Sequence, residues 1–531
     1  MDIQHRNRVW IVPLFIAWCF DFLFWKRTPG ISFFIFVVLC LAGGLLLALW
    51  EKRKPAPRTL WLLLPVLFFS AMTFIRQEAG TNFFNFILTQ GFMVILAMTF
   101  LSGLWLQYSL RDYIAGFFRL AGNTLARPVM HFARRPGNPP ADLPAEQPAK
   151  PTVRPLPVLR GLLLAVPIVA VMAILLASAD PVFNTGLVQF LSFLNLDNLG
   201  EYIFRAIYIS IGAYLLMGVY LHALQVSQHS KLIGIEKPDD VRFLGWTEAA
   251  VVLLLVDLLF AVFVGIQFRY FFGGQANIAV QSFTYADYAR RGFFELVLVA
   301  VLSLLLWMGL STVARRESTN QRRIFSGLGV ALVLLVGVML VSAFQRLLLY
   351  ESAYGFSRLR AYTHVFMICL GLLLLAAVVL ELLQRQRAFV LSILVAALGF
   401  GVSLNLLNVD GFIVQQNLGR AQSGGILDAG YLATLSNDSV PVLFDSFHAT
   451  GLRVDLKDEV GGILACRAAF DQQERHDPSW QSFNAARSVA QDLYSRYQGE
   501  LAAYPVKLGD DGWVVTFGGS QRQCFGFRGY D

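Results

Sequence analysis

The sequence predicts an all-α polytopic transmembrane helix bundle of about eleven spans, followed by a small C-terminal domain that is α+β or mostly helical. Of the 531 residues, 56% are hydrophobic and only 15% are charged, whereas about 25% of the residues in soluble proteins are charged. Many apolar runs approach the roughly 20 residues that cross a bilayer as a helix. Most of these runs lack the polar face that a helix of a soluble protein needs.

Apolar windows bounded by charged residues define the expected spans. The windows are 9–25, 31–50, 59–75, 83–108, 161–178, 202–224, 246–268, 292–314, 324–345, 361–383 and 388–408. Arg6 and Arg8 precede the first window, as in a signal peptide, but the stretch from Trp18 to Lys26 lacks a small-residue cleavage site. We therefore expect the first window to be retained as a span.

Positive charges predict the orientation of these spans. If the N-terminus is cytoplasmic, the segments on that side carry more than twice as many Lys and Arg residues as the opposite loops, as the positive-inside rule requires. An odd number of spans then places the net acidic residues 409–531 on the far side. We expect a multi-pass membrane protein with a cytoplasmic N-terminus and an extracytoplasmic C-terminal domain.

The expected regions are a four-span N-terminal block (1–110), a cytoplasmic segment (111–160), a seven-span block (161–408) and the extracytoplasmic domain (409–531). Apolar residues at helical spacing, interleaved with Arg, predict an amphipathic helix over 111–127. This helix either lies on the inner membrane surface or extends the fourth span. Residues 136–157 are rich in Pro and predict a flexible linker.

Short patterns predict the elements of the C-terminal domain. Residues 428–437 and 439–448 are typical of two short helices, and 481–503 of a longer amphipathic helix. The sequence WVVTF at 513–517 follows a turn signal and predicts a strand. Cys466 and Cys524 lie in this domain and would form a disulfide in an oxidising compartment. The alternative is a pair of free, buried thiols.

Charged residues gather where the chain leaves the predicted outer side of the membrane, for example in LYESAYGFSRLRAYTHVFM at 349–367. Unpaired charges at the edge of hydrocarbon are costly, so we expect them to face one another or a water-filled cavity. The hypothesis is one outward-facing polar cluster made of Asp180, Arg205, Arg290, Arg291, Glu295, Arg346, Glu351, Arg358, Arg360 and His364. Arg would bind phosphate or carboxylate groups, and His would exchange protons. The alternative is a salt-bridge network that only holds helices together.

Asp257, in the run LLLVDLLF, is expected near the middle of the bilayer. An acid at that depth is a functional candidate by default. One interpretation is proton or ion coupling. The other is a protonated acid that forms a hydrogen bond with a neighbouring Ser, Tyr or His.

Several stretches resemble a known family. They are ADPVF at 179–183, FTYADYARRGFFEL at 283–296, the run from 349 to 375, and NVDGFIVQQN with LDAGYLATLSNDSVPVL within 408–443. Together they are similar to the bacterial membrane proteins grouped as DUF4173, which are related to DUF4153. The resemblance covers approximately residues 160–450. The resemblance implies a polytopic protein of the bacterial cytoplasmic (inner) membrane with a periplasmic or extracellular C-terminal domain. No catalytic residue follows from it.

No P-loop, HExxH, GxSxG or CxxC motif occurs in the sequence. We therefore expect no cofactor and no metal site. A function without catalysis is favoured over an enzymatic one. The basic residues are spread over short loops, which argues against nucleic-acid binding. Three functions remain: an envelope scaffold or sensor with a protein partner, a transporter or flippase for an anionic or lipid-linked solute, and a transferase that uses a lipid-linked donor. The expected partners are the bilayer, an anionic lipid or lipid-linked glycan, and an envelope protein.

Overall fold

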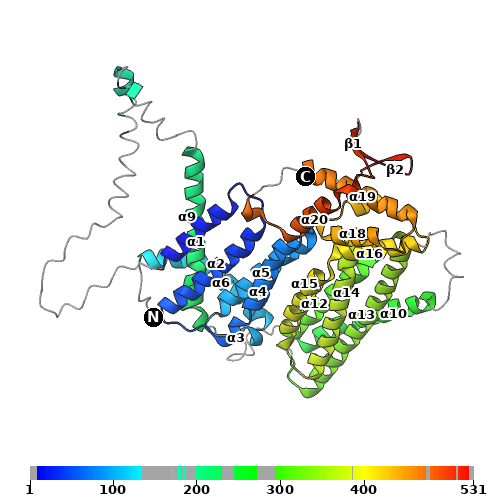
Figure 1. The fold of residues 1–531 in the computed structure, drawn as a ribbon. Helices are drawn as coiled ribbons and strands as arrows, with labels where there is room; N and C mark the ends of the chain where they lie inside the picture. The colour runs from blue at the N-terminus through cyan, green and yellow to red at the C-terminus, as the bar shows by residue number, and fades with distance from the viewer. Residues whose placement is uncertain are drawn as a thin grey trace.

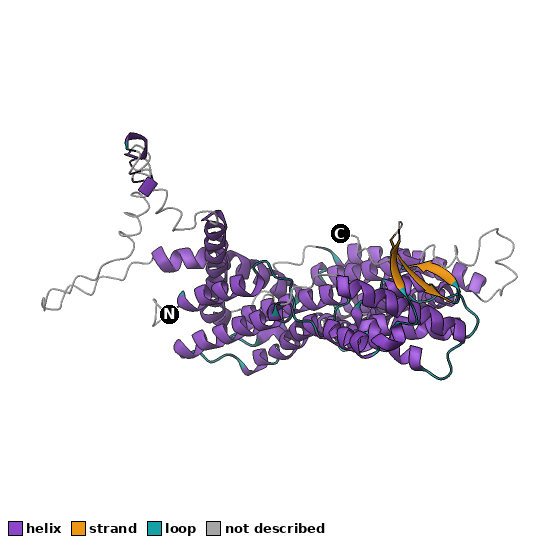
Figure 2. Ribbon diagram, turned by 45° about the horizontal axis from the view of Figure 1, so that its top comes forward, coloured by secondary structure: helices purple, strands orange, loops and turns teal. Residues whose placement is uncertain are grey.

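The computed structural model describes residues 9–133, 199–229, 244–271, 293–385, 387–473, 479–509 and 512–524, with a few isolated positions between 169 and 232. Two groups of helices stand side by side, and the C-terminal domain covers one end of both groups (Figure 1). We call this end the domain end, and the other the opposite end. Helices dominate, and the only described sheet is a small one in the C-terminal domain (Figure 2).

The first group contains the N-terminal helices and one later helix. Its helices are α1 (Ile11–Phe24), α2 (Ile31–Trp50), α3 (Pro57–Leu60), α4 (Leu63–Ile75), α5 (Ala79–Thr99), α6 (Leu110–Ala133) and α9 (Leu199–Gln225). α9 packs along α1 and α6. The helix expected at 202–224 therefore belongs spatially with the N-terminal helices, although the sequence places it after the Pro-rich segment and within the expected seven-span block.

The second group contains α10 (Trp246–Phe271), α12 (Phe293–Val313), α13 (Thr319–Tyr354), α14 (Arg358–Leu382) and α15 (Ala388–Leu407). α13 is central, since it packs against α10, α12 and α14. The core between these helices is almost entirely aliphatic, with Leu332, Ala343 and Ala377 fully buried. α15 packs against both α14 and α5, and so connects the two groups.

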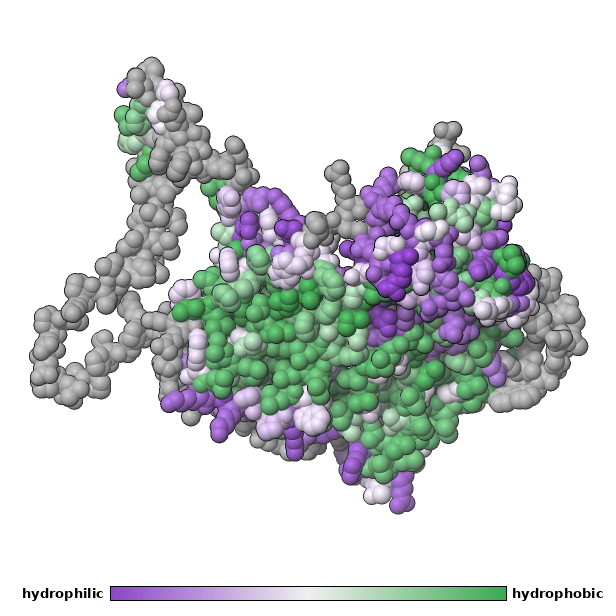
Figure 3. All heavy atoms as spheres, in the orientation of Figure 1, coloured by the Kyte–Doolittle hydropathy of each residue, from purple (hydrophilic) through white to green (hydrophobic). Residues whose placement is uncertain are grey.

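Nine helices among the described residues are long and apolar enough to cross a membrane. α1 is apolar but shorter, and the window expected at 161–178 lies almost entirely outside the described residues. A broad apolar belt crosses both groups, with hydrophilic residues at its two edges (Figure 3). The belt is what a protein surrounded by lipid needs on its outer surface. The predicted polytopic helix bundle is confirmed.

Helix ends from distant parts of the chain meet at each side of this belt. At the domain end, the Ile31 amide donates to the Phe483 carbonyl at 3.0 Å, and Asn484 donates to the Arg76 carbonyl at 3.0 Å. At the opposite end, the Leu101 amide donates to the Ser227 hydroxyl at 3.0 Å. The chain enters the C-terminal domain at the domain end after α15, and the odd number of crossings stays a prediction.

α6 begins after a sharp break in the chain. Gly103 adopts a positive φ of 65°, and a 3-10 turn at Leu104–Gln107 follows it. α6 is therefore a separate helix, and the interpretation as an extension of the fourth span is wrong. α6 docks closely on α9, because a Cβ at Gly218 would lie 2.1 Å from the Thr124 carbonyl oxygen. Its position on a membrane surface stays a prediction.

The C-terminal domain is mostly helical with a small antiparallel sheet, as expected. Its helices are α16 (Val409–Gln422), α17 (Ala429–Ala433), α18 (Val440–His448), α19 (Val454–Gln473), α20 (Ala485–Arg496) and α21 (Gln498–Leu501). The strands β1 (Val506–Gly509), β2 (Gly512–Phe517) and β3 (Ser520–Gln523) follow in the order β1-β2-β3. The strand predicted at 513–517 lies in β2, and the helix predicted at 481–503 is divided between α20 and α21.

Candidate functional site

Arg358, the first residue of α14, is the centre of a charge network at the domain end. Its Nε and Nη2 donate to the two carboxylate oxygens of Asp410 at 2.8 and 2.7 Å, a two-point geometry that suits a guanidinium group. The Asp410 side chain is fully buried. A carboxylate oxygen of Glu78 lies 3.6 Å from the Arg358 Nε, and the Arg358 amide donates to the Tyr431 hydroxyl at 2.8 Å.

Asp438 fixes the turn between α4 and α5 to the C-terminal domain. Its Oδ2 accepts hydrogen bonds from the amides of Gln77 and Glu78 at 2.7 and 2.8 Å. The Arg76 guanidinium lies 3.7 Å from its other oxygen. Burial raises the pKa of the Asp438 carboxyl, although the two amides and Arg76 act in the opposite direction. The Ser436 amide donates to Asp410 at 2.6 Å and its hydroxyl to Asp438 at 3.1 Å, so Ser436 joins the two aspartates into one network.

Glu351 and His364 form a second, separate pair between α13 and α14. The His364 Nε2 lies 2.6 Å from a carboxylate oxygen of Glu351, whose side chain is 2% exposed. The imidazole ring lies edge-on to Phe344, with centroids 5.0 Å apart, and near Phe356. Arg360 takes another direction, with its guanidinium 4.2 Å from the centroid of the Tyr350 ring. These contacts hold the pair inside the helix packing.

Arg205 belongs to a third group, in the first helix group. Its guanidinium forms a two-point ion pair with the buried Asp21 on α1. Glu201, one turn earlier on α9, also accepts from Lys26 at 2.6 Å and from the Trp25 indole at 2.7 Å. The pairing ties the N-terminal part of α9 to the C-terminal part of α1.

The described members of the predicted cluster lie in at least two places, since Arg205 is on α9 in the first helix group, whereas Glu351 and His364 are on α13 and α14 in the second. Arg358, Glu351, His364 and Arg205 have the separate partners given above. Arg346 is buried, whereas Asp180 and Glu295 are exposed. Arg290 and Arg291 lie outside the described residues. One shared cluster stays a prediction, and the described contacts of Arg205, Arg358 and His364 with carboxylates of the chain agree with the alternative of a network that holds helices together.

The acidic partners in these networks are the residues that the sequence did not reveal. They are Asp21, Glu78, Glu201, Asp410 and Asp438. Each lies far along the chain from a basic residue that it meets, although Glu201 is also one turn from Arg205. The two polar residues Asn408 and Asp410 directly after the last span are the one local signal for Asp410.

Asp257 lies close to the middle of α10 and is 7% exposed. Among the described residues, neither of its carboxylate oxygens has a hydrogen-bond partner. The expected hydrogen bond to a neighbouring Ser, Tyr or His is therefore not present in the described part of the chain. A buried polar group without a partner is rare in native structures and needs an explanation.

The C-terminal domain has a cavity of about 730 Å³ between α17, α19 and the sheet. Its apolar wall includes Ile463, Val515 and Phe517, and the ion pair of Glu459 with Arg522 lies at its edge. A disulfide joins Cys466 on α19 to Cys524, directly after β3. Both cysteines also line the cavity, so the disulfide fixes one wall relative to the other. Ligand pockets in proteins commonly measure about 300–1,000 Å³.

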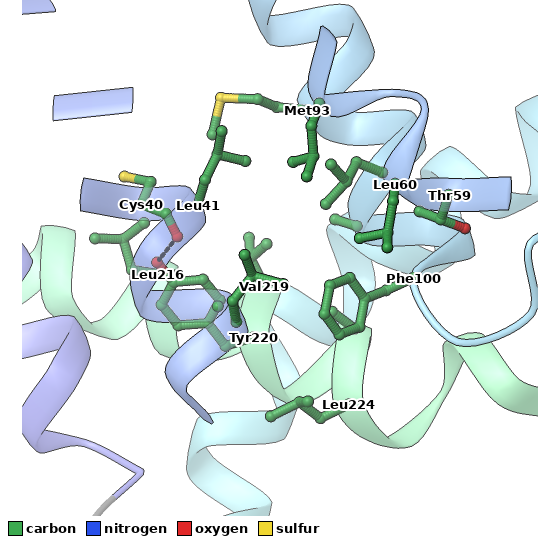
Figure 4. Close-up of a pocket in the computed structure, with 16 residues that line it drawn as sticks. Cys40, Leu41, Thr59, Leu60, Met93, Phe100, Leu216, Val219, Tyr220 and Leu224 are labelled. Carbon is green, nitrogen blue, oxygen red and sulfur yellow. Dashed lines mark hydrogen bonds between the residues drawn. The ribbon is translucent and has the colours of Figure 1, made fainter. Parts of the chain in front are cut away.

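A smaller cavity of about 80 Å³ lies among α2, α4, α5 and α9 (Figure 4). Its lining is apolar, with Leu60, Met93 and Phe100 among the side chains that point into it. The Tyr220 hydroxyl donates to the Cys40 carbonyl at 2.8 Å, and the Thr59 hydroxyl to the Thr99 carbonyl at 2.7 Å. These polar groups are already paired with the chain, so the cavity offers little to a polar ligand.

Comparison with known proteins agrees with this architecture and adds no activity. No curated protein and no solved structure matches the chain. The family model DUF4153, a domain of unknown function, matches residues 63–445. The match starts at α4 and includes α5, so it extends beyond the stretches that carried the resemblance in the sequence. It ends within α18, after Asp410 and Asp438. The chain belongs to the DUF4153 family of proteins with a domain of unknown function.

Proposed function

We propose that this integral membrane protein is an envelope scaffold or sensor of the bacterial inner membrane, with its C-terminal domain outside the cytoplasm. In this proposal the C-terminal domain recognises an envelope partner, and the charge networks transmit the recognition to the helices. The observation that carries the proposal is the attachment of one domain to both helix groups through buried polar contacts.

The attachment to the first group is direct. The Ile31 amide, at the start of α2, donates to the Phe483 carbonyl, and the Ser482 hydroxyl donates to the Thr28 carbonyl at 2.8 Å. The turn between α4 and α5 is bound through Asp438. A displacement of the C-terminal domain would break these hydrogen bonds or move the helices with it.

The attachment to the second group has a different chemical character. Arg358 joins α14 to Asp410 on α16, and the amide of Phe356 donates to the Asn417 side chain at 2.7 Å. Because Asp410 is fully buried, removal of its cation would leave a charge without compensation. The contact favours one fixed position of the domain on the helices, as a sensor or scaffold needs.

The charges themselves favour this function over transport of an anion. A site for a phosphate or carboxylate needs cations that are available to the ligand. Arg358 and Arg205 instead direct their two-point donors at carboxylates of the chain. The surface offered to a partner is therefore the cavity of the C-terminal domain, where Gln521 and Arg522 lie at the sheet and Ile426 is 84% exposed.

Site-specific photocrosslinking in intact cells tests the proposal. A photoreactive residue replaces Gln521, which lines the cavity, and in a second strain Gln498, which is on α21 outside it. We expect a discrete protein adduct from position 521 and none from position 498. In a third strain the photoreactive residue replaces Ile426, which also lines the cavity. Addition of Gln521→Trp to this strain should weaken the adduct, whereas addition of Gln498→Trp should not.

The deletion strain separates the scaffold or sensor from the other candidate functions. We expect its envelope lipids and glycans to match those of the parent strain. An altered lipid-linked glycan, together with no adduct at position 521, would contradict the proposal and favour a transporter, flippase or transferase.

A further inference from the structure

Asp257 is the one acidic residue in the middle of the described α10, and its surroundings determine its charge. The residues Leu254, Leu255, Leu258 and Leu259 are all more than half exposed and form the face of α10 that points away from the protein. Leu253 is fully buried, and Asp257 lies one turn after it on the packed face. The carboxyl group is therefore directed toward the neighbouring helices and not toward lipid.

The neighbour on that face is α13. Leu244, just before α10, pairs with Ala314, just before α13, so the two helices start side by side and run in the same direction. The Ser342 hydroxyl donates to the Gln267 side chain at 2.7 Å, which sets their register. Asp257 precedes Gln267 by ten residues, so it lies at the level of Leu332, which is fully buried. Between Ser326 and Ser342, α13 has no polar side chain. This part of α13 therefore offers no side-chain donor or cation to the carboxyl group.

The charged and titratable residues of the adjacent helices lie elsewhere. On α12 and α13 they are Glu295, Arg322, Arg323, Arg346, Tyr350, Glu351 and Tyr354, all toward the ends of these helices. A metal cation in place of a partner would need several oxygen ligands around it. The described hydrophobic cluster around these helices contains Ala, Val, Leu, Ile, Phe, Met and Trp, none of which has a side-chain oxygen, and the Ser303 hydroxyl of α12 donates to the Val299 carbonyl of its own helix.

From this geometry we propose that Asp257 is a proton-binding site in the membrane core: the residue is a neutral carboxylic acid in the packing described here. An ionised carboxylate without a hydrogen bond or a cation is strongly disfavoured in an apolar setting, and such groups take up a proton instead. Release of the proton requires a group that accepts it and hydrogen-bond donors that stabilise the carboxylate, and water can be both. Water reaches the carboxyl group only if α10 moves relative to α13. The packing of these two helices then depends on protonation. The proposal is independent of the partner-binding function of the C-terminal domain.

Infrared difference spectroscopy of the full-length protein in lipid nanodiscs tests this assignment. A protonated carboxyl group gives a C=O stretching band at higher wavenumber than the bands of a carboxylate. At pH 7, where an exposed Asp with a pKa of about 3.9 is ionised, the Asp257→Asn variant should lose one protonated-carboxyl band that the wild type shows. Asp257→Glu keeps a carboxyl group and should shift this band without removing it.

Asp455→Asn is the matched control. Asp455 is exposed and pairs with Arg453 at 2.7 Å, so its variant should lose carboxylate bands and keep the protonated band. The proposal is overturned if Asp257→Asn loses only carboxylate bands. If Asp257→Asn does not fold, the wild type and Asp257→Glu still decide the question, since the absence of a shifted protonated band also overturns it.

Discussion

Arg358 and Asp410 form a two-point ion pair that joins the first residue of α14 to the first turn of α16. The two residues flank the last two membrane helices, so the pair closes the chain segment that contains α14 and α15. Asp410 is fully buried and the Arg358 side chain is 31% exposed. The pair therefore lies at the boundary between the C-terminal domain and the apolar belt.

Arg358→Ala should destabilise the protein by about 3–5 kcal/mol, because it leaves the buried Asp410 carboxylate without its cation. Denaturant or thermal unfolding in detergent measures the effect. Arg453→Ala is the control, since Arg453 and Asp455 form an exposed pair, and such pairs contribute little to stability. Equal effects of the two substitutions would contradict the account of the network.

Asp438 predicts a pH dependence of stability. Burial raises its pKa in the folded protein, so the folded state binds the proton more tightly than the unfolded state. This tighter proton binding stabilises the folded state. The stabilisation is fully present below the unfolded pKa of about 3.9 and is lost as the pH rises through the folded pKa. As the pH rises above the unfolded pKa of about 3.9, the wild type should lose stability relative to Asp438→Asn in paired unfolding measurements. A gain would contradict the burial argument.

The disulfide predicts a sensitivity to reductant that is local to the C-terminal domain. Cys466 and Cys524 are separated by 58 residues, and a cross-link over such a loop stabilises the folded state by about 2–4 kcal/mol. The double substitution Cys466→Ser and Cys524→Ser should lower the stability of the domain by this amount. Reductant should lower the unfolding midpoint of the wild type and leave that of the double variant unchanged. A double variant that is as stable as the oxidised wild type would contradict this prediction.

The close contact between α6 and α9 predicts an intolerance of side chains at Gly218. A Cβ there meets the Thr124 carbonyl at 2.1 Å, so Gly218→Ala should cost about 1–3 kcal/mol through a forced shift of α6. Gly91→Ala on α5 is the matched control. Nothing lies within 4 Å of the position that a Cβ would take there, and Ala favours a helix by about 0.5–1 kcal/mol over Gly. Unfolding midpoints of the two variants should move in opposite directions.

The sequence is sufficient to predict the membrane helices, because length and apolar composition alone decide whether a segment can cross a bilayer. It also predicts β2, whose residues follow a turn signal. α19 (Val454–Gln473) is not predictable in this way. This helix packs against α17, α18, α20 and the sheet, so it is buried on several sides and has no single apolar stripe that a periodicity could reveal.

The charge networks are only half predictable. The basic members Arg205 and Arg358 stand out in an apolar chain, and their cost at the membrane edge predicts partners. Which acids they meet depends on the packing of helices that are distant in the sequence, as Glu78 and Asp410 are for Arg358. Local patterns carry no information about such pairs, so a shared predicted depth does not show which charged residues lie together.

Thiol labelling in intact cells tests most directly the claim that the C-terminal domain lies outside the cytoplasm. In a background in which the free cysteines Cys19, Cys40 and Cys369 are replaced by Ala, Gln498→Cys reports on the domain end and Lys52→Cys on the opposite end. A membrane-impermeant maleimide should label Gln498→Cys in intact spheroplasts and Lys52→Cys only after lysis. Labelling of Lys52→Cys in intact spheroplasts, with Gln498→Cys protected until lysis, would contradict the orientation and the proposed envelope function.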